Sequence, residues 1–117
     1  MSVAHKRAAR REREAATALG TERVRHRPRY VSAPDTLPVR LPSGDVLQPE
    51  VKTRKRLPRL IVDALTQAMR YQADAIPVAV ISETGGHAIA CLPLEDLARL
   101  LGLQPQRLVQ LPLLGCA

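Results

Sequence analysis

Two turn sequences constrain the fold most, because each of them lies between two short apolar runs. Proline, serine, glycine and aspartate gather at residues 42–45, and two glycines follow one another at 85–86. Such residues favour tight turns, and a tight turn between two apolar runs predicts an antiparallel hairpin. We therefore expect two strand pairs, the second of them a buried hairpin: 36–41 with 46–53, and 76–82 with 87–92.

Three segments that flank these hairpins have the composition of helices. Residues 3–19 are rich in Ala, Arg and Glu and are followed by Gly20, a residue that often ends helices. The clearest helix is 58–72, which begins with Pro58 and repeats its apolar residues with a 3.6-residue period. A short amphipathic helix is expected at 94–101.

The order of these elements predicts an α+β or α/β fold. The basic segment 22–32 is expected to be extended, because its Pro28 disfavours a helix. The order is then α-β-β-β-α-β-β-α, which we interpret as helices flanking a mixed central sheet. A chain of 117 residues has the size of one domain, so we expect a single domain over 1–102 and an unassigned apolar tail over 103–117.

The sequence shows no feature of an exported or membrane-bound protein. No apolar run approaches the roughly 18 residues that a membrane span requires. The basic beginning of the chain lacks the apolar core of a secretory signal, so we expect a cytoplasmic protein without a membrane partner. Cys91 and Cys116 are isolated and suggest neither a zinc site nor a disulfide framework.

Positive charge is concentrated in the first half of the chain. The formal net charge is +7, and residues 1–60 hold fifteen Lys or Arg against six Asp or Glu. A basic half of this kind attracts polyanions, of which nucleic acid is the usual one. Because the chain has only two aromatic residues, contact with the phosphates of a duplex fits better than stacking on single strands. The alternative is a basic surface that serves solubility alone.

The strongest chemical signal is the tripeptide Glu50-Val51-Lys52 in the second predicted strand. Side chains alternate along a strand, so Glu50 and Lys52 share one face while Val51 points into the core. A carboxylate beside an ammonium suits a magnesium site, in which the acid binds the ion and the amine acts on a water near the phosphate. A surface strand with an ordinary salt bridge is the alternative.

Asp35 can supply the second carboxylate of such a site. The hairpin 36–53 folds back on itself, so the start of its first strand can lie beside the end of its second. Hard divalent cations bind two or more oxygen ligands. Asp45 competes for this role, but it lies at the turn, away from Lys52, and we favour Asp35.

Two further polar residues could join the site. Glu12 lies in the middle of the alanine-rich face of helix 3–19, where a buried carboxylate requires a cation or a metal ion. An ion pair with a flanking arginine is the alternative for Glu12. Gln67 lies one turn before Tyr71 on helix 58–72, and it could bind a phosphate or a water, or simply contact the tyrosine.

A cluster of cations follows Lys52 directly. We expect these side chains to neutralise phosphates of a bound duplex and to make binding strongly dependent on salt. The expected contacts are Arg54, Lys55, Arg56 and Arg59, with Arg10 and Arg11 on the solvated face of the first helix. A solvated loop without a ligand is the alternative.

The order of these motifs resembles that of the PD-(D/E)xK nuclease superfamily, and in particular of its small Holliday junction resolvase-like and phage-type endonucleases. The similarity covers about residues 6–101 and rests on four short motifs: Arg11-Glu12-Arg13-Glu14 with Leu19-Gly20, Ala33-Pro34-Asp35, Glu50-Val51-Lys52 and Gln67-Ala68. Each motif is weak alone, and their order makes them more specific together.

The resemblance implies a restriction-endonuclease-like αβββαβ core and Mg²⁺-dependent hydrolysis of DNA, with Mn²⁺ able to replace Mg²⁺. Carried over by position, Asp35, Glu50 and the Val51 carbonyl bind the metal, and Lys52 acts on the attacking water. Glu12 matches the first-helix acid, as a further metal ligand. Gln67 of this chain matches the glutamine of the second conserved helix. The substrate is then double-stranded or branched DNA such as a Holliday junction, and the enzyme is often a homodimer.

Two prolines depart from the pattern of this family. Pro49 directly precedes Glu50 and Pro38 lies in the partner strand, and each removes a donor from the strand ladder. A bulge or an edge position could accommodate them. Two other functions stay open: a catalytically inactive DNA-binding or regulatory module of the same fold, and a small basic structural or RNA-associated protein in which the motif is accidental.

Overall fold

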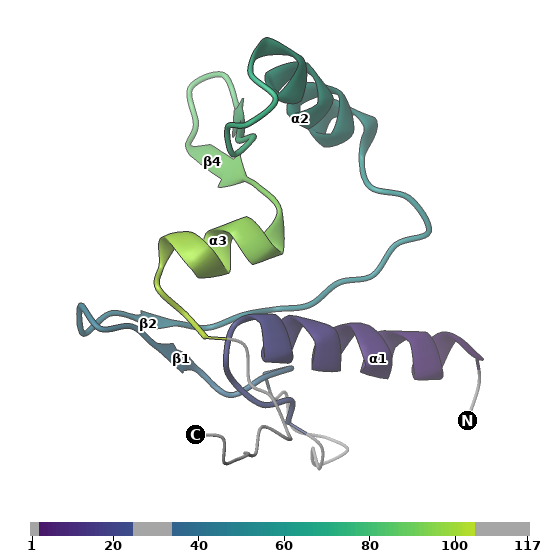
Figure 1. The fold of residues 1–117 in the computed structure, drawn as a ribbon. Helices are drawn as coiled ribbons and strands as arrows, with labels where there is room; N and C mark the ends of the chain where they lie inside the picture. The colour runs from purple at the N-terminus through teal and green to yellow at the C-terminus, as the bar shows by residue number, and fades with distance from the viewer. Residues whose placement is uncertain (1–2, 25–33, 105–117) are drawn as a thin grey trace. The chain divides into compact units, whose positions relative to one another are not determined.

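The computed structural model describes residues 3–24 and 34–104. Within them, helices and short strands follow one another in the predicted order except for the extended segment expected at 22–32 (Figure 1): α1 Val3–Ala18, β1 Val39–Arg40, β2 Val46–Leu47, α2 Arg59–Tyr71, β3 Ala79–Ser82, β4 Ala88–Cys91 and α3 Leu94–Leu100. Most of the predicted extended segment 22–32 and of the tail 103–117 lies outside the described residues. The predicted mixture of helices and strands is confirmed.

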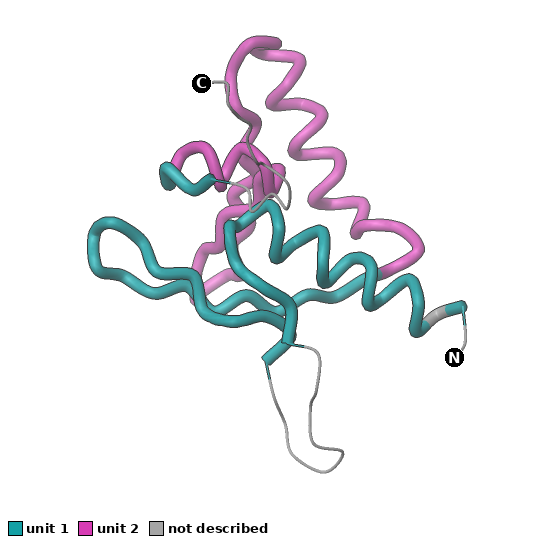
Figure 2. The backbone as a smooth tube through the Cα atoms, turned by 60° about the horizontal axis from the view of Figure 1, so that its bottom comes forward, with its two compact units in different colours: residues 1–53, 101–117 teal, residues 54–100 magenta. Residues whose placement is uncertain are grey.

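The chain divides into two compact units (Figure 2). The first comprises residues 1–53 and 101–117 and contains α1, β1 and β2, whereas the second comprises residues 54–100 and contains α2, β3, β4 and α3. Each unit has a small core of its own, formed by Ala16, Leu19 and Val39 in the first and by Ala79 and Ala98 in the second. None of the described helices is long and apolar enough to span a bilayer.

α1 forms because alanine, arginine and glutamate have high helix propensity, and it ends at Ala18, two residues before Gly20. Gly20 has a φ of 72°, a left-handed conformation that favours glycine. Its N–H donates a hydrogen bond of 3.1 Å to the carbonyl of Thr17. The residues on the predicted inward face are buried or half-buried: Ala8, Ala9, Glu12, Ala15, Ala16 and Leu19. The 3.6-residue period thus predicted the packing face of this helix correctly.

β1 and β2 pair in antiparallel fashion around the predicted turn. Each strand has two residues, so the predicted strands 36–41 and 46–53 are too long. Pro38 and Pro49 explain where the ladder stops, since proline has no N–H to donate. Residues 50–52 consequently lie beyond β2, and their predicted place within a strand is wrong.

A third extended segment lies beside the start of this hairpin. Arg23 and Thr36 form an antiparallel bridge, flanked by two backbone hydrogen bonds of 2.8 and 3.0 Å. Thr36 is fully buried, and its carbonyl accepts a hydrogen bond of 3.1 Å from the side-chain amide of Gln48. The predicted segments 22–32 and 36–41 are therefore neighbours where the structure describes them, at Arg23 and Thr36. A single isolated bridge joins them, and not a longer ladder of hydrogen bonds.

In the second unit, α2 packs against β3. The helix presents the apolar stripe that its period predicts, which is half-buried at Ile61, Ala64, Leu65 and Ala68. β3 pairs with β4 in antiparallel register, so these two strands form a sheet of their own. Among the described residues, the strands form two separate antiparallel pairs, and the predicted mixed central sheet is not seen.

The hairpin of β3 and β4 is more exposed than the sequence predicts. Val80 is 66% exposed and Ile89 is 59% exposed, and Ala79 is the buried residue of β3. A sheet of two strands has two faces, and a single helix covers no more than one of them. The prediction of a buried hairpin is therefore wrong for these residues.

Candidate metal and nucleic-acid site

Asp35 lies against the segment that follows β2. Its Oδ2 accepts a hydrogen bond of 2.8 Å from the backbone N–H of Val51, the residue between Glu50 and Lys52. Asp35 is only 7% exposed. The two stretches of sequence that were expected to converge, sixteen residues apart, therefore meet at this contact.

Glu50 and Lys52 lie on the same side of their segment. The Lys52 Nζ is 3.3 Å from the Glu50 Oε1, and both side chains are exposed while Val51 is half-buried. This alternation is the one expected, although residues 50–52 form no strand. An exposed pair of this kind contributes only about 0–1 kcal/mol to stability. The salt bridge alone would fit any surface, so the nearby Asp35 is the more informative feature.

The chemistry of the available donor atoms suits magnesium. The carboxylates of Asp35 and Glu50 and the carbonyl of Val51 offer oxygen only, the donor that Mg²⁺ prefers. No three Asp, Glu, His or Cys side chains that could hold a metal ion are grouped within residues 3–24 and 34–104. Mg²⁺ is usually held by one or two carboxylates, with waters and substrate phosphates completing its octahedron. The residues present therefore fit an ion that is bound together with a phosphate substrate.

Glu12 is buried on the inward face of α1, where it is 9% exposed. Its Oε2 accepts a hydrogen bond of 2.9 Å from the Nε–H of Arg23, whose side chain is 22% exposed. The buried carboxylate has a cation as expected, but this cation comes from the segment after the helix and not from a flanking arginine. A role for Glu12 as a metal ligand stays a prediction.

The cations predicted to contact DNA are exposed. Arg10 and Arg11 lie on the solvated face of α1, and both form ion pairs with Glu14. The Arg10 Nε is 3.7 Å from the Glu14 Oε1, and the Arg11 Nη1 is 2.8 Å from the Glu14 Oε2. The other predicted DNA contacts lie at the beginning of the second unit, and all four are exposed: Arg54, Lys55, Arg56 and Arg59. Arg59 lies 3.5 Å from Asp63. Contact of these residues with DNA stays a prediction.

Gln67 lies on the exposed side of α2, in the second unit. Its Nε2 donates a hydrogen bond of 3.0 Å to the Oη of Tyr71, one turn further along the helix. This contact is the simpler of the two alternatives for Gln67. A role toward a phosphate or a water stays a prediction.

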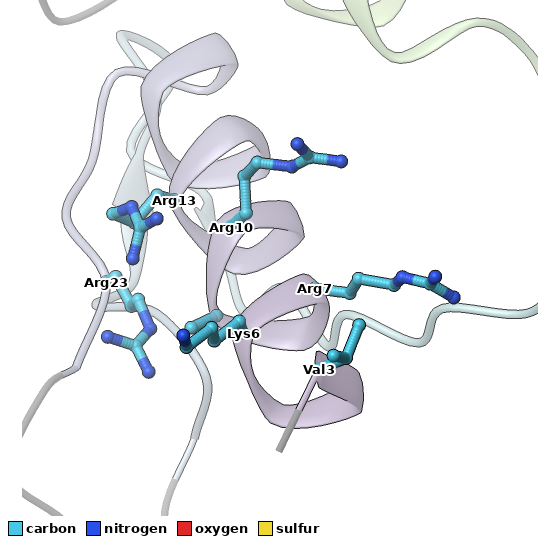
Figure 3. A pocket seen from close by; sticks show the side chains of 7 residues that line it. Val3, Lys6, Arg7, Arg10, Arg13 and Arg23 are labelled. Carbon is cyan, nitrogen blue, oxygen red and sulfur yellow. The ribbon is translucent and has the colours of Figure 1, made fainter. Parts of the chain in front are cut away.

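A pocket of about 600 Å³ lies along α1 in the first unit, at a place that the sequence pattern did not predict (Figure 3). Among the described residues, the charged ones that line it are all cations: Lys6, Arg7, Arg10, Arg13 and Arg23. The spacing of three and four residues within α1 could have indicated the four helical members. Arg23 gave no signal in the sequence, because its place beside α1 depends on how the chain folds back.

Comparison with protein-family models, with curated proteins and with solved structures gives no match for this chain. The resemblance to PD-(D/E)xK nucleases therefore stays a prediction, which rests on the four motifs. The molecule itself offers an α+β chain in which a buried aspartate adjoins an exposed glutamate–lysine pair.

Proposed function

We propose that this chain is a metal-dependent DNA endonuclease of the PD-(D/E)xK type. The observation that carries the proposal is the hydrogen bond of 2.8 Å from the Val51 N–H to the Asp35 Oδ2. It brings a buried aspartate to the segment that bears Glu50 and Lys52. Two carboxylates and an amine at adjoining positions are the groups that hydrolysis of a phosphodiester with Mg²⁺ uses.

Each residue has a distinct role in the proposed reaction. Asp35 and Glu50 hold the Mg²⁺, with the Val51 carbonyl as a further oxygen donor. When bound, the ion polarises the phosphate and makes a nearby water easier to deprotonate. Lys52 donates a hydrogen bond to the attacking water and orients it toward phosphorus. Glu50, 3.3 Å from the Lys52 ammonium, keeps that ammonium beside the site.

The arrangement of the first unit supports the fold that belongs to this function. Three extended segments follow α1 along the chain, and each lies beside the next. They are the segment at Arg23, the segment at Thr36 and the strand β2. This is the order in which an αβββαβ core begins. We propose a reduced form of the restriction-endonuclease-like core, with strands shortened by Pro38 and Pro49.

The proposal is tested by incubating the full chain with supercoiled plasmid, linear duplex and a synthetic four-way junction, in Mg²⁺, Mn²⁺ or EDTA. We expect cleavage with either ion, none in EDTA, and a loss of at least about 100-fold for Lys52→Ala. Arg40→Ala, which removes an exposed cation from β1, is the control and should retain cleavage. Cleavage that persists in EDTA, or in Lys52→Ala, contradicts the proposal. The substrate cut fastest identifies the preferred DNA structure, branched or plain.

A DNA-binding module without catalysis is the second candidate. The cationic pocket along α1 favours it, because such a pocket can attract phosphate without any metal ion. Binding of duplex in EDTA together with an absence of metal-dependent nicking would support this function. No binding of DNA at moderate salt would point to a basic structural or RNA-associated protein.

A further inference from the structure

The described lining of the pocket along α1 carries five cations, and the side chains of Arg7 and Arg10 extend to the other side of the helix from those of Lys6 and Arg13 in Figure 3. Lys6, Arg10 and Arg13 recur at intervals of four and three residues along the helix, and Arg7 precedes Arg10 by three residues. Figure 3 shows the side chains of Lys6 and Arg13 near that of Arg23, which comes from the segment after the helix. Like charges at such spacings repel one another and destabilise a helix. A bound anion would remove this repulsion.

Acidic side chains compensate this charge only in part. None of the described lining residues is acidic. The Glu14 Oε1 lies 3.7 Å from the Arg10 Nε, and the Glu12 Oε2 lies 2.9 Å from the Arg23 Nε. The other three cations of the lining form no ion pair with a described residue. The pocket therefore keeps a surplus of positive charge that an anionic ligand would neutralise.

Arg23 is oriented in the pocket by Glu12. The Nε–H of Arg23 donates its hydrogen bond to the Glu12 carboxylate, and most of the Arg23 side chain is shielded from solvent. A guanidinium carries five N–H groups in a planar fork, so the four N–H groups of its terminal nitrogens take no part in the pair with Glu12. A fork that is fixed before the ligand arrives can donate two parallel hydrogen bonds to a phosphate.

We propose that this pocket binds the phosphate backbone of DNA, apart from the candidate metal site. Lys6, Arg7 and Arg13 supply the charge, Arg23 supplies the oriented fork, and Glu12 acts as its positioning residue. The identity of the polyanion rests on the proposed function, but the binding itself needs no metal ion.

The length of the cationic face favours a backbone over a single small anion. From Lys6 to Arg13 the helix advances by roughly 10 Å, at about 1.5 Å per residue. A DNA strand carries a phosphate about every 3.4 Å along the duplex axis. Cations along this stretch can therefore face successive phosphates, whereas one inorganic phosphate can contact only some of them.

The test measures binding of a fluorescent duplex by anisotropy, in EDTA and at several NaCl concentrations. The pocket variant carries Lys6→Gln, Arg7→Gln and Arg13→Gln, and helix content by circular dichroism confirms that it folds. The control variant removes the same number of exposed charges outside the pocket, by Arg40→Gln, Arg70→Gln and Arg99→Gln. We expect the pocket variant to bind at least about 10-fold more weakly, with a salt slope reduced by about 2 to 3, and the control to change far less.

Three outcomes decide the proposal. A reduced slope in the pocket variant alone supports it, even if the wild-type protein never nicks DNA, in which case only the endonuclease proposal fails. Equal losses in the two variants mean that net charge alone attracts the duplex, and the pocket proposal is overturned. A pocket variant that binds the duplex as tightly as the wild-type protein, with an unchanged salt slope, would show that the pocket does not contact the backbone and would also overturn it.

Discussion

The carboxylate of Asp35 accepts a hydrogen bond of 2.8 Å from the backbone N–H of Val51, which ties the residue before the first hairpin to the segment after it. This contact gives Asp35 a structural role beside the proposed chemical one. Replacement by alanine would disturb both at once. A variant that keeps an acceptor but loses the charge separates them.

Asp35→Asn is that variant, because its amide oxygen can still accept the Val51 N–H. We expect Mg²⁺-dependent cleavage to fall at least about 100-fold, since a neutral amide is a poor ligand for a hard cation. DNA binding in EDTA should stay the same or become tighter, because a negative charge near the phosphates is removed. Cleavage gels and anisotropy titrations measure the two effects.

Asp45→Asn is the matched control for this change. Asp45 lies exposed at the turn of the hairpin and accepts a hydrogen bond of 2.9 Å from the Ser43 hydroxyl. The substitution makes the same change in charge as Asp35→Asn but lies at the turn of the hairpin, away from Glu50 and Lys52, and cleavage should stay at the wild-type rate. Unchanged cleavage in Asp35→Asn would show that Asp35 has been assigned wrongly.

Glu12→Gln distinguishes a residue that positions Arg23 from one that binds the metal ion. The amide oxygen of glutamine can accept the Arg23 hydrogen bond. We therefore expect Mg²⁺-dependent cleavage within about 3-fold of wild type, a loss of less than about 1 kcal/mol in transition-state stabilisation. Glu12→Ala leaves the mostly covered guanidinium without its partner and should cost about 1–3 kcal/mol of stability, measured by urea unfolding. A folded Glu12→Gln protein that loses cleavage would instead support the metal-ligand role.

Gly20→Ala should destabilise the first unit more than Gly44→Ala does. Both glycines have positive φ, 72° and 96°, so an alanine is strained by about 1–2 kcal/mol at either position. At Gly20 the new Cβ would also lie 2.6 Å from the carbonyl oxygen of Gln104, whereas at Gly44 nothing lies within 4 Å. The backbone must shift at Gly20, and we expect a total loss of about 2–4 kcal/mol there. Equal unfolding midpoints for the two variants would contradict this contact.

Local patterns in the sequence predicted the helices and turns well. The alanine stripe around Glu12 marked the inward face of α1, and the period of α2 marked its half-buried stripe. Both features depend on neighbours one turn away, which the sequence shows directly. The turn around Gly44 was also recognised, because its residue types carry their own conformational preference.

Features that depend on distant neighbours were predicted less well. The strands are shorter than expected because Pro38 and Pro49 interrupt the ladder, whereas the apolar pattern alone predicts strands that continue past both prolines. Apolar composition suggested that the hairpin of β3 and β4 is buried, but composition does not say how many layers cover it. The approach of Asp35 to the segment 50–52 was expected from the geometry of a hairpin, but its hydrogen bond with the Val51 N–H was not. The pairing of Glu12 with Arg23 had no counterpart in the sequence pattern.

The central claim is that Asp35 and Glu50 hold one divalent ion, and titration of the metal-free chain with Mn²⁺, followed by calorimetry, tests it most directly. We predict about one ion per wild-type chain, affinity at least about 10-fold weaker for Asp35→Asn and Glu50→Gln, and wild-type affinity for Asp45→Asn. No saturable binding by the wild-type chain, or the same affinity in all four proteins, would contradict it.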